Sequence, residues 1–142
     1  LLRGMNEGHL ANSAGDSEPF WSYPHFSHAW RDGDNLHVLI FDNGDEYEPQ
    51  MSRVVEYVID EAAGTATEVW EYPHPEGSFM RILGDARRLA GGNTLIAWAP
   101  TGMIEEVTPE KERVWFATSS LGQTIGRVTP VGDMFQPTDV SR

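Results

Sequence analysis

The chain has 142 residues, of which 39% are hydrophobic and 11% aromatic, a composition typical of a folded domain and not of a disordered one. Its formal net charge is −12, from 22 acidic and 10 basic residues, which argues against binding to nucleic acid or to anionic membranes. The lack of cysteine excludes disulfides and thiolate metal sites, and no apolar run approaches the roughly 20 residues that a transmembrane helix needs.

In chain order, residues 1–25 contain much Gly, Ser, Asn and Pro without hydrophobic periodicity, so we expect an irregular connection. Leu36 to Phe41 is a short apolar run that ends in an Asp-Asn-Gly turn. Two β-rich runs follow at residues 53–60 and 65–72. The same order of runs and turns then recurs at 93–98, 103–108 and 113–117. Pro, Gly and β-branched residues interrupt every window that could hold a helix, so the sequence predicts an all-β fold.

Matched positions support an internal repeat. Trp70 matches Trp115, Glu56 matches Glu105, and the segment around His28 stands where Gly84 and Asp85 stand later. Units of about 45 to 57 residues with four short strands are typical of β-propellers. We interpret the matched tryptophans as packing between neighbouring units and not as a ligand platform.

The predicted organisation is a partial β-propeller of four-stranded antiparallel blades over residues 26–142. The units fall at about 26–80 and 81–120, with a partial unit at 121–142. About two and a half to three blades do not close a propeller. We therefore expect a C-terminal fragment of a longer protein, whose remaining blades, or further copies of the chain, cover the open faces.

Four segments, in this order and spacing, carry a family likeness: Phe26–Ala29, Leu39–Gly44, Ser52–Glu61 with Glu68–His74, and Gly84–Trp98. They resemble the propeller domain of the arylsulfotransferase family, bacterial enzymes that work without adenosine-phosphosulfate. The resemblance implies a six-bladed propeller, an exported (periplasmic or secreted) location, and sulfuryl transfer from a phenolic sulfate ester to another phenol. The implied partners are small-molecule phenols and aryl sulfates. No cofactor and no bound metal are expected.

The resemblance also implies site residues. His28 stands where the family places a channel histidine, as nucleophile or acid/base, with His25 as its competitor for that position. Arg53 is the candidate for clamping the sulfate, because a guanidinium matches sulfate oxygens in a fork. Arg87 is a further candidate for substrate binding.

An alternative function is a non-catalytic propeller module that serves for binding or as a scaffold. The second unit favours this alternative, because it carries Gly84-Asp85 where the first unit carries a histidine. Structural roles are expected for other polar residues as well. We expect His74 to be a solvated turn residue, His37 to be a satisfied strand histidine, and the acidic loop that begins at Asp42 to be a solvated turn and not a calcium site.

Overall fold

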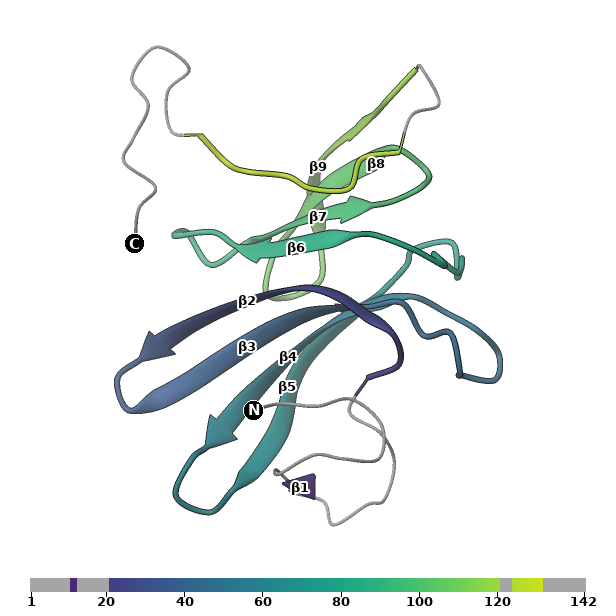
Figure 1. Cartoon of the computed structure of the whole chain (residues 1–142). Helices are drawn as coiled ribbons and strands as arrows, with labels where there is room; N and C mark the ends of the chain where they lie inside the picture. Colours follow the sequence, from purple (N-terminus) through teal and green to yellow (C-terminus); the bar gives the residue numbers. More distant parts are fainter. Residues whose placement is uncertain (1–10, 13–20, 121–123, 132–142) are drawn as a thin grey trace.

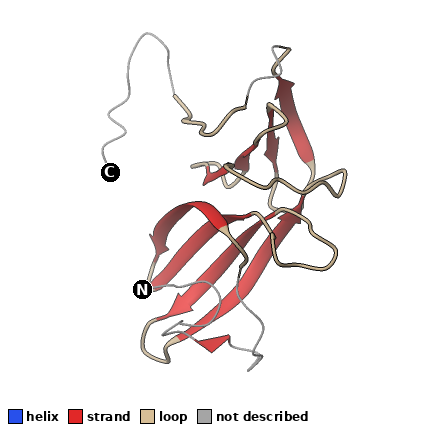
Figure 2. Ribbon diagram, turned by 45° about the vertical axis from the view of Figure 1, so that its right-hand side comes forward, coloured by secondary structure: helices blue, strands red, loops and turns tan. Residues whose placement is uncertain are grey.

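The computed structural model describes residues 11–12, 21–120 and 124–131, and these residues form two antiparallel sheets without a helix (Figures 1 and 2). The first sheet has the order β2-β3-β4-β5, and a two-residue strand β1 pairs in parallel with β5. The second sheet has the order β6-β7-β8-β9. The strands are β1 (Ala11–Asn12), β2 (Pro24–Asp32), β3 (Asn35–Asp42), β4 (Arg53–Asp60), β5 (Thr65–Pro73), β6 (Asp85–Arg88), β7 (Thr94–Trp98), β8 (Met103–Val107) and β9 (Arg113–Thr118).

Both sheets are meanders in which each strand pairs with its neighbour in the chain, and they face one another with β2 beside β6 (Figure 1). The prediction of an all-β fold built from four-stranded antiparallel blades is confirmed. The strand β2 begins two residues before the predicted start of the first blade. The described part of the predicted third unit, residues 124–131, contains no strand.

The space between the two sheets holds the larger of two hydrophobic clusters. Phe41 of the first sheet meets Trp98 of the second edge to face, with ring centroids 5.3 Å apart. Such aromatic pairs contribute about 0.5–1.5 kcal/mol beyond the area that they bury. The cluster consists of Leu39, Phe41, Val54, Tyr72, Met80, Ala86, Ile96, Trp98 and Val107.

The opposite face of the first sheet carries the second cluster, which contains Val38, Ile40, Val55 and Tyr57. Because β3 is covered on both faces, its sequence is a nearly continuous apolar run and not an alternation of apolar and polar residues. Successive residues of β3 and β4 therefore enter different clusters. Which cluster a side chain joins also decides which functional groups can meet.

The Asp-Asn-Gly turn after β3 is buried, so the prediction of a solvated acidic turn is wrong for Asp42. Its carboxylate accepts hydrogen bonds from the backbone N–H of Ser22 (2.8 Å), the Tyr47 hydroxyl (2.6 Å) and Arg53 Nε (3.1 Å). Ser22 lies 20 residues from Asp42 and Arg53 lies 11 residues from it, so only the folded chain brings these partners to the carboxylate. The turn anchors the end of the first sheet.

His74 also differs from the sequence expectation, because it is buried and not solvated. Its Nδ1 accepts the backbone N–H groups of Glu76 (3.2 Å) and Ser78 (3.4 Å), and its ring packs edge to face on Trp98 at 4.7 Å. Burial lowers the pKa of His74 and outweighs the opposite effect of Glu76. The neutral ring closes one end of the space between the sheets.

The structure corrects one of the matched pairs of the repeat by one residue. Glu105 lies opposite Ile96 and accepts a hydrogen bond from Trp98 Nε1 at 2.5 Å, so it faces the first sheet. Glu56 faces the second sheet, where it contacts Arg88. The matching of Glu56 with Glu105 is therefore wrong, and Glu106 is the counterpart of Glu56. Both Glu56 and Glu106 lie opposite a tryptophan and directly before a β-bulge.

Candidate functional site

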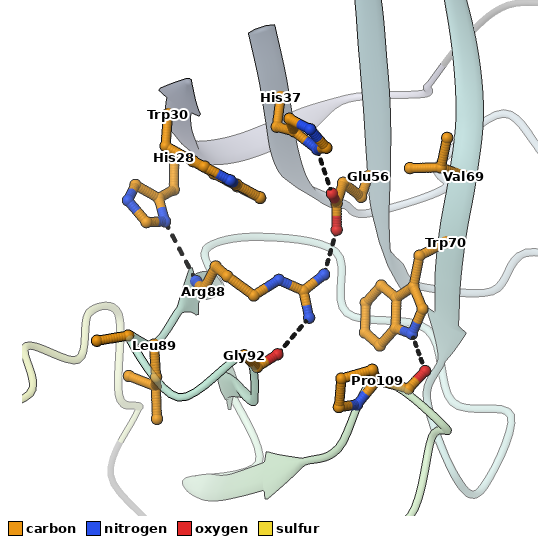
Figure 3. A pocket seen from close by; sticks show the side chains of 11 residues that line it. His28, Trp30, His37, Glu56, Val69, Trp70, Arg88, Leu89, Gly92 and Pro109 are labelled. Atoms are coloured by element: carbon orange, nitrogen blue, oxygen red, sulfur yellow. Dashed lines mark hydrogen bonds and ion pairs between the residues drawn. The ribbon is translucent and has the colours of Figure 1, made fainter. Parts of the chain in front are cut away.

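A pocket of about 580 Å³ lies between the two sheets, beside the hydrophobic cluster (Figure 3). Side chains from β2, β3, β4 and β5 of the first sheet reach it, and Arg88 enters from the end of β6. The lining residues are His28, Trp30, His37, Glu56, Val69, Trp70, Arg88, Leu89, Ala90, Gly92 and Pro109. The pocket thus combines an imidazole pair, an ion pair and two indoles.

Arg88 crosses the pocket and joins the two sheets. Its guanidinium forms an ion pair with Glu56 and lies over the rings of Trp70 (5.0 Å) and Trp30 (5.9 Å). It also donates to the carbonyl oxygen of Gly92 at 3.0 Å. The other Glu56 oxygen accepts from His37 Nδ1 at 2.7 Å, which gives His37 the satisfied strand position that was expected. Because both charges of this largely buried pair are fully hydrogen-bonded, the cost of their desolvation is offset.

His28 is bound through one ring nitrogen to the backbone of the second sheet. Its Nδ1 accepts the N–H of Arg88 at 3.1 Å, so the neutral ring carries its hydrogen on Nε2. Partial burial lowers the pKa of His28, and the positive charge of Arg87 adds to this effect, against an opposite contribution from Asp85. The ring is therefore neutral at pH 7. In this state it offers a hydrogen-bond donor at Nε2 and no free lone pair.

Asp85 of the second sheet also accepts a backbone N–H from the segment that follows its sheet. Its carboxylate accepts the backbone N–H of Val128 at 3.0 Å, as His28 accepts that of Arg88. Arg87 supports this contact, with its Nε donating to the Val128 carbonyl oxygen at 2.8 Å and to Asp85 at 3.3 Å. His28 and Asp85 therefore each bond their sheet to the segment that follows it, although the register places Arg87, and not Asp85, in the row that corresponds to His28.

The structure does not bring Arg53 together with His28. His28 lies opposite Leu39, which faces the second sheet, whereas Arg53 lies opposite Asp42 on the other face. The Arg53 guanidinium is largely buried and forms ion pairs with the three carboxylates of Asp42 (3.1 Å), Glu71 (3.1 Å) and Glu68 (3.3 Å). The role of Arg53 in sulfate binding stays a prediction.

The remaining two candidate site residues are His25 and Arg87. His25 precedes a β-bulge and shares a hydrogen bond of 2.8 Å with Asn43 Oδ1. It lines a separate pocket of about 330 Å³ on the other face of the first sheet. Arg87 lies near enough to His28 to affect its pKa. Of the four predicted site residues, the structure therefore places His28 and Arg87 near one another.

Sequence reasoning missed Arg88, Glu56 and Trp30 as residues of the pocket. The signal for Arg88 was present as an arginine pair in the segment Gly84–Trp98. Alternation sends neighbouring side chains to opposite faces, so one of the two arginines had to face the first sheet. Only the register of β6 decides which one does so.

The described residues define an all-β protein of two antiparallel sheets with a polar, aromatic-lined pocket between them. The model of the family described as Arylsulfotransferase (ASST) matches residues 8–127, and the chain belongs to this family. No curated protein matches the chain. Among the described residues, no group of three or more His, Asp or Glu side chains is placed to hold a metal ion. No helix in this part of the chain is long and apolar enough to cross a membrane.

Proposed function

We propose that the protein transfers a sulfuryl group from a phenolic sulfate ester to a phenol, with His28 in contact with the reacting group. In this reaction the sulfur–oxygen bond of the donor breaks, the donor phenolate leaves, and the acceptor oxygen bonds to sulfur and loses its proton. The observation that carries the proposal is the meeting of imidazole, guanidinium and indole groups in one pocket of a chain of this family. The indoles suit an aromatic ring, and the cations suit a sulfate.

The geometry favours one role for His28 over another. Since Nδ1 is occupied by the Arg88 N–H, only Nε2 can face a substrate, and in the neutral ring Nε2 carries hydrogen. A hydrogen-bond donor at this position stabilises the negative charge on a sulfate oxygen or a departing phenolate. For His28 to act as the nucleophile, Nε2 must first lose its proton or Nδ1 must release the Arg88 N–H. We therefore assign it the role of donor in the resting site.

The cation for the sulfate is assigned by proximity to His28. Arg88 lines the pocket together with His28, whereas Arg87 is not among the lining residues and bonds to Asp85 and the Val128 carbonyl oxygen. Arg53 is the weaker candidate, because it lies on the other face of the sheet from His28. We propose Arg88 as the group that attracts the sulfate, and the role of Arg87 in substrate binding stays a prediction.

The test is the turnover of p-nitrophenyl sulfate with phenol as acceptor, measured by release of p-nitrophenolate. Absence of turnover over a range of phenols would refute the proposed reaction. His28→Asp is the matched variant, since Asp85 shows that a carboxylate can accept the same type of cross-sheet N–H. We expect this variant to keep the melting temperature but to lose at least about 100-fold in turnover, the scale of removing one preorganised donor. Turnover at the wild-type rate would remove His28 from the reaction.

A second candidate function is a non-catalytic binding or scaffold module. The similar contacts of His28 and Asp85 favour it, because both residues connect consecutive segments by accepting a backbone N–H. On this hypothesis His28 serves only as an acceptor. The same assay separates the two functions, since a scaffold shows no turnover while His28→Asp keeps its stability.

A further inference from the structure

The second sheet carries a half-open counterpart of the contact that Arg88 makes with the first sheet. In the first sheet, Glu56 is held by His37, lies opposite Trp70 and pairs with the Arg88 guanidinium, which covers the Trp70 ring. We call the three residues that receive the guanidinium a cradle. His37, Glu56 and Trp70 form this first, filled cradle.

The counterpart consists of Asn93, Glu106 and Trp115. Asn93 Nδ2 donates to Glu106 Oε1 at 2.6 Å, as His37 donates to Glu56. Glu106 lies opposite Trp115, and a bulge follows Glu106 as it follows Glu56. Glu106 belongs to β8 and Trp115 to β9. Because Glu105 faces the first sheet, its neighbour Glu106 lies on the other face of the second sheet. Three side chains thus repeat the hydrogen bond, the cross-strand pair and the bulge of the filled cradle.

This second cradle lacks its cation. Glu106 has no ion pair with any residue that the structure describes, and the Trp115 side chain is 49% exposed.

We propose that Asn93, Glu106 and Trp115 form an interaction surface for the arginine side chain of an extended partner segment. A guanidinium fits because its planar fork pairs with the free Glu106 oxygen while its face stacks on the Trp115 indole. A lysine ammonium offers a point charge without the flat face. The net charge of −12 further favours a basic partner segment over an acidic one.

A peptide that copies residues 84–92 provides the probe, because this segment fills the first cradle in the native protein. Two forms are compared, one with arginine and one with the uncharged isostere citrulline at the position of Arg88. Binding is followed by the NMR shift of the Trp115 indole N–H, which a Trp115→Phe variant assigns. We expect the arginine peptide to bind about 10-fold more tightly than the citrulline peptide, and Glu106→Gln to remove this preference.

The charge control is Glu110→Gln, which removes one exposed carboxylate from the turn before β9 and leaves the cradle intact. The Glu110→Gln variant should keep the 10-fold preference for the arginine peptide over the citrulline peptide. Equal affinities for the two peptides, no binding of the arginine peptide, or an unchanged preference in Glu106→Gln would each overturn the proposal.

Discussion

The ion pair between Arg88 and Glu56 should be one of the strongest energetic connections between the two sheets. Both side chains are largely buried, with 14% and 8% of their surface exposed. Arg88→Met removes the guanidinium and keeps most of the chain length, but it leaves the Glu56 carboxylate with His37 as its partner. Breaking one side of a buried pair costs about 3–5 kcal/mol, and we expect a loss of this size. Glu56→Gln should cost less, because the amide oxygen can still accept a hydrogen bond from Arg88.

The assay is a double-mutant cycle from urea unfolding of the wild type, Arg88→Met, Glu56→Gln and the double variant. We expect a coupling energy of at least about 1.5 kcal/mol, because removing both charges relieves the penalty of leaving one of them alone. Arg31→Met is the control, since the Arg31–Glu61 pair has a distance of 2.7 Å but both side chains are more than half exposed. It should change stability by less than about 1 kcal/mol. Additive effects of Arg88→Met and Glu56→Gln would refute the inference that this ion pair connects the two sheets energetically.

Two further predictions concern packing and pH. Gly84→Ala should destabilise the protein by more than about 2 kcal/mol in a urea titration, because φ is +112° there and a Cβ would lie 2.4 Å from the Phe41 ring. The control is Gly33→Ala, which should cost less stability because the space around Gly33 is open. Equal losses would contradict the steric argument. His74 has a pKa lowered from its ordinary value of 6.5, so the unfolded chain takes up a proton before the folded one, and stability should fall as the pH drops below about 6.5. His74→Gln should lose less stability than the wild type between pH 7.5 and 5.5; an identical loss would show that His74 does not contribute.

Strand positions and the matched tryptophans could be predicted from the sequence, because both follow from local patterns. Trp70 and Trp115 do occupy equivalent places, each opposite a glutamate. The glutamates themselves were mismatched by one residue. A shift of one residue moves a side chain to the other face of a sheet, and the bulge that sets the register has no sequence signal of its own.

The same uncertainty limited the site prediction. Whether Arg53 or Glu56 faces the second sheet depends on the alternation along β4, and which arginine enters the pocket depends on that along β6. Both faces of these strands are buried at several positions, so hydrophobicity did not distinguish the faces. The ion-pair partners of Arg53 come from two other strands, β3 and β5, and only the folded sheet shows that its charge is compensated.

The contrast between His28 and Asp85 bears on what the pocket does. The cross-sheet contact requires only an acceptor for a backbone N–H, and Asp85 shows that a carboxylate satisfies this need. An imidazole adds a second nitrogen, which in the neutral ring is a donor directed away from that contact. Asp85 is fully buried, whereas His28 lines the pocket and can present this donor to a ligand. The property that distinguishes His28 from Asp85 is therefore the Nε2–H group, and a reaction that depends on His28 should depend on that group and not on the acceptor that both residues share.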